Sequence, residues 1–224
     1  MHRHLTISVV IPCYNEELGV KAVIQRLPPG VDEVVVVDNA STDRTAEVAR
    51  SLGARVIVES RRGYGAAYKA GLRTATGDVI VTLDGDGTYP PEEIPRLVEV
   101  LVDRGWEFLS ACRFPLADAA AMPWSNRLGN AILTAATAVL FWKAVRDSQS
   151  GMWVFRRAVL ERLRLTSDGM AFSEEIKLEA LLRGVRFGEE HIPYGTRIGE
   201  AKLQKWRDGW DNLAFLVRKR IGLA

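Results

Sequence analysis

The sequence is poor in cysteine and histidine. Its 224 residues include two cysteines, Cys13 and Cys112, and three histidines. Two cysteines are too few for a disulfide framework, so a reducing compartment is the simpler expectation. The histidines are scattered and show no metal-binding spacing. We expect both cysteines to be small buried hydrophobic residues rather than nucleophiles.

A long apolar run is also missing. The longest uncharged stretch covers residues 128–142, whereas a bilayer span needs roughly 20 apolar residues. No signal-peptide pattern follows Met1. We therefore expect no transmembrane helix. Residues 128–142 are either part of the core or a partly exposed apolar ledge that faces a lipid chain.

No excess of charge of one sign marks the chain as a whole. Its net charge is +2, its charged fraction 26% and its hydrophobic fraction 47%, which excludes a disordered, collagen-like or coiled-coil protein and favours one globular domain. The charge is unevenly placed, because residues 197–224 hold seven basic and three acidic side chains. This tail has an aromatic-rich, basic pattern that suits either a lipid headgroup boundary or a packed helix.

The pattern of the first half predicts alternating strands and helices. Short β-branched runs predict strands at 7–11, 33–37, 55–58 and 78–83, and amphipathic stretches predict helices at 16–27, 42–52, 65–74 and 91–103. The second half is less regular, with strands expected at 108–112, 151–156 and 185–192, and helices at 125–145, 173–183 and after 205. Such alternation predicts a mostly parallel sheet built from βαβ units.

Polar side chains follow the predicted strands of the first half. These residues are Pro12, Tyr14 and Glu16 after the first strand, Asp38 after the second, and Asp84 and Asp86 after the fourth. The carboxyl ends of parallel strands meet at one edge of a sheet, where ligands bind. We therefore expect a binding site at this edge.

The usual glycine-rich phosphate loops are absent from the sequence. Neither Gly-x-Gly-x-x-Gly nor the P-loop pattern follows a strand, so a bound diphosphate would need a metal ion instead. Asp84 and Asp86 flank one glycine and could hold Mg2+ or Mn2+. An isolated Asp-x-Asp is more often a surface turn, but its place after a buried strand favours a site.

Several ordered motifs together resemble a known family. They are VVIPCYNEE at 9–17, VVVVDNASTDRT at 34–45, GYGAAYKAGLRTATGDVIVTLDGDGTYPPEEIPRLV at 63–98 and DSQSGMWVFRR at 147–157. The chain resembles family-2 glycosyltransferases of the GT-A fold, especially the dolichyl-phosphate mannose synthase branch, which acts on polyprenyl phosphates. The resemblance implies one α/β domain, with a mostly parallel central sheet flanked by helices and a basic amphipathic C-terminal helix. Its expected parts are a nucleotide-sugar-binding half at 1–112, an acceptor half at 113–196, and a basic loop with an amphipathic tail at 197–224.

The resemblance also implies roles for individual residues. The nucleotide-binding set is Pro12, Tyr14, Glu16, Asp38, Asp84, Arg197 and Lys202, and the metal-binding pair is Asp84 and Asp86. The catalytic set is Asp86, Asp147, Glu175, Arg113 and Arg127, with both arginines near the acceptor phosphate. Arginines are more often surface salt-bridge partners, and either acceptor-side acid could be a general base, a positioning group or a helix cap. Glu174 is expected to be a solvated helix residue.

Two positions depart from the family pattern. Asn39 stands where many relatives have a second Asp, and Thr88 stands where the nearest relatives often have Gln or Ser. These differences bear on the details of nucleotide and metal contact rather than on the class of reaction.

The implied activity is an inverting transfer of a hexose or N-acetylhexosamine. The donor is a GDP- or UDP-sugar, the acceptor a dolichyl or undecaprenyl phosphate, and the cofactor Mg2+ or Mn2+. The protein is expected at the cytoplasmic face of a membrane as a peripheral enzyme, with no nucleic-acid partner and a possible membrane-protein partner. Two alternatives stay open: the same donor chemistry with a soluble acceptor such as a sugar acid or glycan, and a non-catalytic nucleotide-sugar-binding subunit of a membrane complex.

Overall fold

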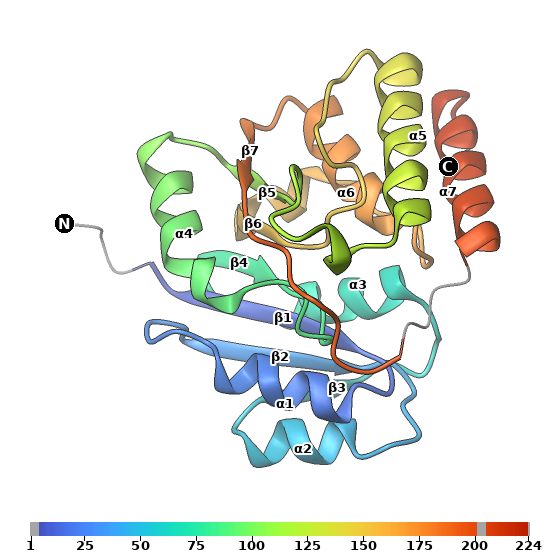
Figure 1. The fold of residues 1–224 in the computed structure, drawn as a ribbon. Helices are drawn as coiled ribbons and strands as arrows, with labels where there is room; N and C mark the ends of the chain where they lie inside the picture. Colours follow the sequence, from blue (N-terminus) through green and yellow to red (C-terminus); the bar gives the residue numbers. More distant parts are fainter. Residues whose placement is uncertain (1–4, 201–204, 224) are drawn as a thin grey trace.

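A seven-stranded sheet with helices on both faces forms the centre of the molecule (Figure 1). The computed structural model describes residues 5–200 and 205–223. The strands lie in the order β3-β2-β1-β4-β6-β5-β7. Their bounds are β1 Ile7–Cys13, β2 Glu33–Asp38, β3 Arg55–Val58, β4 Val79–Thr82, β5 Phe108–Cys112, β6 Trp153–Arg156 and β7 Phe187–His191. The helices are α1 Glu17–Gln25, α2 Thr45–Ser51, α3 Tyr64–Thr74, α4 Ile94–Asp103, α5 Trp124–Phe141, α6 Phe172–Leu182 and α7 Lys205–Arg220.

The strands β1, β2 and β4 are apolar on both sides because both faces of the sheet are covered there, whereas the edge strand β3 is partly exposed. Val9 and Ile11 of β1 pack toward α1, α2 and α4, in a cluster that includes Val20 and Leu97. Val10, between them, points to the opposite face, where α3 and α6 pack. Successive strand side chains alternate between faces, so an unbroken valine and isoleucine run indicates burial on both. The predicted strands and helices of the first half are confirmed to within a few residues.

The second half completes the sheet with one reversed strand. β6 lies antiparallel to both β4 and β5, whereas β5 and β7 are parallel. The prediction of a single α/β domain with a mostly parallel sheet is confirmed. The strand expected from Gly151 begins only at Trp153, and a short 3-10 helix at Arg157–Arg162 was not predicted. The helical segment expected at 125–145 is the single helix α5, which ends at Phe141.

The C-terminal helix α7 is fastened to α5 and α6. Leu216 of α7, Leu133 of α5 and Leu178 of α6 form a small apolar cluster. Below it, the Lys219 ammonium lies 3.3 Å from a Glu175 oxygen and 3.0 Å from a Glu179 oxygen, with all three side chains nearly buried. A buried cation shared by two carboxylates loses little to solvent screening, so it fixes how α7 sits on α6.

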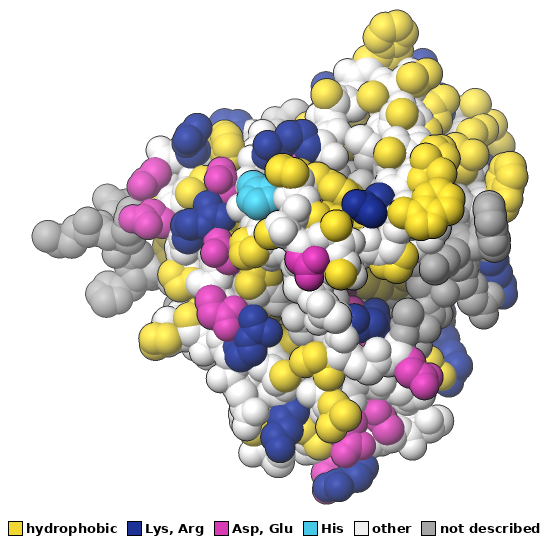
Figure 2. Space-filling model, viewed as in Figure 1, with side chains coloured by type: hydrophobic (Ala, Val, Ile, Leu, Met, Phe, Trp, Pro, Cys, Tyr) yellow, Lys and Arg dark blue, Asp and Glu magenta, His cyan; other side chains and the backbone are white. Residues whose placement is uncertain are grey.

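The uncharged stretch 128–142 is both core and surface. Leu133 and Thr137 are buried, but other apolar side chains of α5 are exposed, Val139 to 74% and Trp142 to 86%. We call the exposed set the apolar ledge, and it consists of Trp124, Leu128, Ile132, Val139 and Trp142. Figure 2 shows hydrophobic side chains gathered over α5. None of the helices within residues 5–200 and 205–223 is long and apolar enough to cross a bilayer.

Candidate active site

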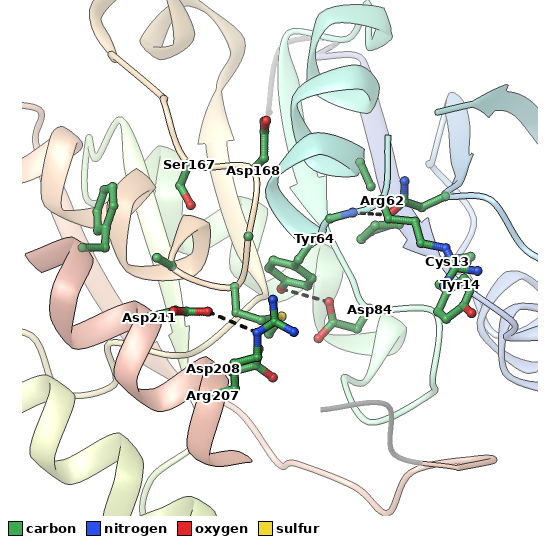
Figure 3. Close-up of a pocket in the computed structure, with 18 of the residues that line it drawn as sticks. Cys13, Tyr14, Arg62, Tyr64, Asp84, Ser167, Asp168, Arg207, Asp208 and Asp211 are labelled. Carbon is green, nitrogen blue, oxygen red and sulfur yellow. Dashed lines mark hydrogen bonds and ion pairs between the residues drawn. The ribbon is translucent and has the colours of Figure 1, made fainter. Parts of the chain in front are cut away.

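A pocket of about 830 Å³ opens at the carboxyl ends of β1 and β4. The predicted residues Pro12, Tyr14, Glu16, Asp84, Asp86 and Arg197 all line it. Its other walls are the start of α3, the loop 166–171 and the inner face of α7. Figure 3 shows Tyr14 with Arg62 at one end, Arg207 with Asp211 of α7 at the other, and Tyr64 with Asp84 between them. The site predicted at the sheet edge therefore exists as a single cavity.

Asp84 is held by two tyrosines. The hydroxyls of Tyr64 and Tyr68 both donate to its Oδ1 atom, at 3.1 and 3.2 Å. Its Oδ2 atom accepts no hydrogen bond from any residue that the structure describes. Burial, together with repulsion from Asp86, raises the pKa of Asp84 from 3.8 to about 7. A carboxylate in this state gains more than an ordinary one from a nearby cation.

Both oxygens of Asp86 are engaged by protein groups. Its Oδ1 atom accepts hydrogen bonds from the backbone N–H and hydroxyl of Thr88, at 3.0 and 2.7 Å. Its Oδ2 atom pairs with the Arg197 guanidinium at 2.7 Å, and the same guanidinium pairs with Glu16. Arg197 thus joins carboxylates that follow two different strands. Thr88, a departure from the family pattern, orients Asp86.

The segment that carries Arg197 is docked on the loop after β4. Gly195 donates its N–H to the Thr88 carbonyl and Ile198 donates to the Asp86 carbonyl, both at 2.8 Å. Ile198 also covers Gly87 closely enough that a Cβ there would meet its side chain at 2.9 Å. These contacts bring a distant part of the chain onto the Asp-x-Asp turn.

The residues present fit a divalent cation that is shared with a ligand. Within the described ranges, no three His, Cys, Asp or Glu side chains are grouped to hold a metal by themselves. Asp84 and Asp86 offer two carboxylates in an open pocket, and Mg2+ is commonly bound by one or two carboxylates plus substrate phosphates. The Arg197 guanidinium already stands beside Asp86 as a positive charge. The donor set therefore suits an ion that arrives with phosphate oxygens.

Tyr14 and its neighbours form the other end of the pocket. The Arg62 guanidinium lies 4.3 Å from the centre of the Tyr14 ring. Asn39 fixes the loop before Arg62, because its amide donates to the carbonyls of Glu59 and Arg61, at 2.9 and 2.8 Å, and accepts from the Gly63 N–H. An aspartate could not make both donations.

Asp38 lies at the end of β2, outside the pocket lining. It is nearly buried, and its Oδ1 atom accepts from the Ser41 N–H at 3.2 Å. The cavity lining at the end of β2 is formed by Asn39, the next residue, and not by Asp38 itself. At the end of β1, by contrast, the predicted residues Pro12, Tyr14 and Glu16 all line the cavity.

Arg113 and Asp147 form a buried bidentate ion pair rather than lining the pocket. Two guanidinium nitrogens of Arg113 lie 2.8 Å from the two Asp147 oxygens, and the Arg113 N–H donates to Asp147 at 3.0 Å. Burial by itself would raise the pKa of Asp147, but Arg113 outweighs it and the pKa lies below the ordinary value. The pair ties the end of β5 to the loop before β6.

Two further ionisable groups are buried on α6, next to this pair. Lys177 donates to the carbonyls of Asp147 and Ser150, both at 2.9 Å, and burial lowers its pKa to about 8. Glu174 is only 1% exposed, so the expectation of a solvated residue is wrong. Among the residues that the structure describes, neither of its oxygens has a hydrogen bond of good geometry. Burial raises its pKa to about 8, and nearby Gln149 opposes this rise only in part. The stretch 172–180 of α6 is buried throughout, whereas Leu182 at its end is exposed.

The remaining predicted residues lie apart from the cavity. Glu175 accepts from the Thr166 and Ser167 N–H groups, both at 2.9 Å, and from the Thr166 hydroxyl at 2.7 Å, so it holds the loop that walls the pocket. Arg127 lies in the first turn of α5, and its guanidinium has no ion pair among the described residues. Lys202 falls outside the described residues.

Sequence reasoning missed several lining residues. No motif assigns a role to Tyr64 or Arg62, although both line the pocket. The lining loop 166–171 and the α7 residues Arg207 and Asp211 also belong to no local motif. Tyr64 and Tyr68 are four residues apart, and Tyr64 directly precedes the helix predicted at 65–74, so a start one residue earlier places both on one face. That spacing was the one available signal for their shared contact with Asp84.

The fold is that of a GT-A glycosyltransferase. The family model described as "Glycosyl transferase family 2" matches residues 8–164, more than half of the chain. The chain therefore belongs to glycosyl transferase family 2, and the enzyme class expected from the motifs is confirmed.

Named relatives agree with the polyprenyl-phosphate branch. The chain is 37% identical to a dolichyl-phosphate hexose transferase of Haloferax volcanii, over 91% of this chain and 89% of that protein. It is 34% identical to a low-salt glycan biosynthesis hexosyltransferase of the same organism, over 95% of this chain but only 53% of that protein. The chain thus spans about half the length of the second relative.

A solved structure shares the fold. Glucosyl-3-phosphoglycerate synthase from Mycobacterium tuberculosis, crystallised with Mn2+, UDP and glucosyl-3-phosphoglycerate, superposes with a TM-score of 0.76. The match covers 98% of this chain and 81% of that chain at 24% identity.

Proposed function

We propose that this enzyme transfers a hexose or N-acetylhexosamine, with inversion, from a nucleotide-diphosphate sugar to a polyprenyl phosphate. One observation carries the proposal: Asp84, Asp86 and Arg197 meet in a cavity at the carboxyl ends of the sheet. The relatives named for dolichyl-phosphate hexose transfer support the acceptor class. The fold neighbour that binds UDP and Mn2+ supports a nucleotide donor and a divalent ion.

On the donor side, the pocket end at Tyr14 receives the nucleotide. The Tyr14 ring and the Arg62 guanidinium give a flat, cationic surface for a base. Pro12 and Glu16 shape the same wall, Asp38 supports it from the end of β2, and Lys202 is proposed to join Arg197 on the diphosphate. We thereby assign residues 1–112 to donor binding and residues 113–196 to acceptor binding. Residues 197–224 would serve both, as the basic loop and the amphipathic tail.

Asp84 and Asp86 are the residues that would hold Mg2+ or Mn2+. When bound, the ion would neutralise charge that develops on the departing diphosphate. Arg197 supplies a second positive charge at the same place, since its guanidinium already reaches Asp86 and Glu16. Catalysis then rests on positioning and electrostatic stabilisation.

On the acceptor side, Arg127 is free to meet a phosphate. It is the one charged residue of α5, in a helix whose exposed side is the apolar ledge. A lipid phosphate whose chain lies along the ledge would present its anionic end to this guanidinium. The phosphate is already an anion near neutral pH, so no base is needed to activate it. Arg113 and Asp147 contribute by fixing the end of β5.

The apolar ledge supports a peripheral position at a membrane surface. Exposed apolar groups of this size and number indicate an interaction site, and α7 adds exposed Trp210, Val217 and Ile221 near the basic residues Arg218 and Arg220. Such a mixture fits the boundary between headgroups and acyl chains. The cytoplasmic face and a membrane-protein partner stay predictions.

A transfer screen tests the proposal. The full chain would be incubated with UDP- and GDP-sugars, with Mn2+ or chelator, and with a short polyprenyl phosphate or a soluble sugar acid. We expect product only with the polyprenyl phosphate and only with metal, and an anomeric configuration opposite to that of the donor. Transfer to the soluble acceptor alone would favour the first alternative. Donor binding without turnover under any condition would favour the non-catalytic subunit.

A further inference from the structure

The Asp-x-Asp pair has four carboxylate oxygens, and three of them are occupied by protein groups. Two phenols take Asp84 Oδ1, Thr88 takes Asp86 Oδ1, and Arg197 takes Asp86 Oδ2. Within the described part of the chain, Asp84 Oδ2 is the oxygen that has no donor. The two oxygens of the Asp84 carboxylate therefore differ, because Oδ1 accepts hydrogen bonds and Oδ2 faces the pocket without one.

The two phenols are firmly placed. Tyr68 is fully buried, and its ring stacks on Phe172 with centres 5.7 Å apart. Tyr64, one helical turn earlier on α3, makes an edge contact with the Tyr68 ring at 4.8 Å. Residues four apart project from the same side of a helix, so both hydroxyls converge on one oxygen. Figure 3 shows the Tyr64 hydroxyl directed at Asp84.

Gly151 closes the space behind the carboxylate. A Cβ at this position would lie 3.2 and 3.3 Å from the two Asp84 oxygens and would collide with the Tyr64 hydroxyl. The glycine backbone cannot easily yield, because its N–H donates to the Tyr89 hydroxyl at 2.7 Å and its carbonyl accepts from Thr82 at 2.8 Å. The Tyr68 hydroxyl lies 3.3 Å from this carbonyl and 3.2 Å from Asp84 Oδ1, so its single proton is shared between the two acceptors. The Asp84 carboxylate is thus held in one rotational position.

We propose that Tyr64 and Tyr68 are positioning residues that make Asp84 a one-oxygen metal ligand and thereby favour Mg2+ and Mn2+ over Ca2+. The inference rests on the proposed function, because it requires the metal at Asp84 and Asp86. Mg2+ demands compact octahedral geometry, whereas Ca2+ takes six to eight oxygens and commonly uses both oxygens of a carboxylate. Two hydroxyls on Oδ1 block the two-oxygen mode that would benefit Ca2+ most.

The test compares metals rather than rates. The full chain, with UDP and separately with GDP, would be titrated with Mn2+ by electron paramagnetic resonance, and bound Mn2+ would then be competed with Ca2+. In the Tyr64→Phe/Tyr68→Phe double variant we expect the ratio of the Ca2+ to the Mn2+ dissociation constant to fall at least tenfold. Tyr194→Phe is the comparison variant, since its phenol hydrogen-bonds to Thr88 on the Asp86 side and not to Asp84. Its loss should therefore leave the ratio of the two dissociation constants within about twofold of wild type.

The outcomes separate this inference from the proposed function. If the wild-type chain binds no Mn2+ with either nucleotide, the metal part of the proposed function fails and the inference fails with it. The second case is that the wild-type chain binds Mn2+ but the double variant leaves the ratio of the two dissociation constants unchanged. This holds whether both ions bind more weakly or both bind as before. The tyrosines then only pack, and this inference alone is overturned. Tyr64→Phe, at the more exposed position, gives the same reading with a smaller change if the double variant does not fold.

Discussion

The two halves of the chain use their motif residues in different ways. In residues 5–112, the predicted side chains Tyr14, Glu16, Asp84 and Asp86 stand at strand ends and line one cavity. In residues 113–223, Arg113, Asp147 and Glu175 point inward and hold segments together. Arg197 is the exception, because it reaches across to the first half. A family motif thus locates a residue reliably but does not tell whether it touches ligand or supports the fold.

The largest expected effect belongs to the donor half. Asp86→Asn keeps the size of the side chain but removes the charge that faces Arg197 and the proposed metal. We expect the rate of sugar transfer to fall by about 10²- to 10³-fold, the range seen when a group that stabilises transition-state charge is lost. Initial rates at saturating donor measure it. Asp103→Asn, which changes an exposed acid at the end of α4, is the control. A transfer rate of Asp86→Asn within tenfold of wild type would contradict the proposed role of Asp86.

The next effect separates architecture from chemistry in the second half. Asp147→Asn leaves the Arg113 guanidinium buried without its counter-charge, which typically destabilises a protein by about 3 kcal/mol or more. Urea unfolding measures the loss. Replacing both partners, as Arg113→Met/Asp147→Leu, should recover at least about 1 kcal/mol, since the lone guanidinium charge is then removed as well. Recovery stays incomplete because the buried Lys177 ammonium also loses the charge of Asp147. Unchanged stability with abolished transfer would instead return Asp147 to the chemistry.

The buried ionisable residues of the second half, Glu174 and Lys177, should also make the stability of the fold depend on pH. The pKa of Glu174 is about 8 in the fold against an ordinary 4.5. The folded state therefore binds more protons than the unfolded state between these values, and stability falls as pH rises through this window. Lys177, with a pKa of about 8 against 10.5, acts oppositely, so stability rises again between pH 8 and 10.5.

Glu174→Gln should remove the fall in stability between about pH 4.5 and 8. At pH 8 the variant should be more stable than wild type by on the order of 2 kcal/mol, and near pH 4.5 the two should agree. Chemical denaturation at several pH values measures this. Glu161→Gln, on the surface, should follow the wild-type curve, and a Glu174→Gln profile parallel to wild type would refute the assignment.

The smallest expected effect tests the surface of the second half. Ile132→Asp/Val139→Asp places two charges on the apolar ledge, and we expect binding to anionic phospholipid vesicles to fall about tenfold, because less apolar area can leave water. Co-sedimentation measures the binding. Leu18→Asp on α1, another exposed helical leucine, serves as the matched control in the first half. Equal losses in both variants would show that the ledge is not the docking surface.

Much of the fold and the donor edge could be predicted because the responsible signals are local. Unbroken valine and isoleucine runs fixed β1 to β4, and the position of Asp84 and Asp86 after a buried strand placed them in the cavity. The antiparallel β6 and the burial of Glu174 could not be foreseen, because they depend on which distant segments pack together. The contact of Arg197 with Glu16 spans 181 residues of sequence separation, and no spacing rule reports it.

The carboxyl end of the chain has a practical consequence. Leu223, just beyond α7, is among the residues that line the cavity, together with Phe215 and Arg218. Polypeptide placed directly after Leu223, such as a purification tag, would extend from the lining of this cavity. Assays of this enzyme should therefore carry any affinity handle at the amino end, or remove the carboxyl one by protease before turnover is measured.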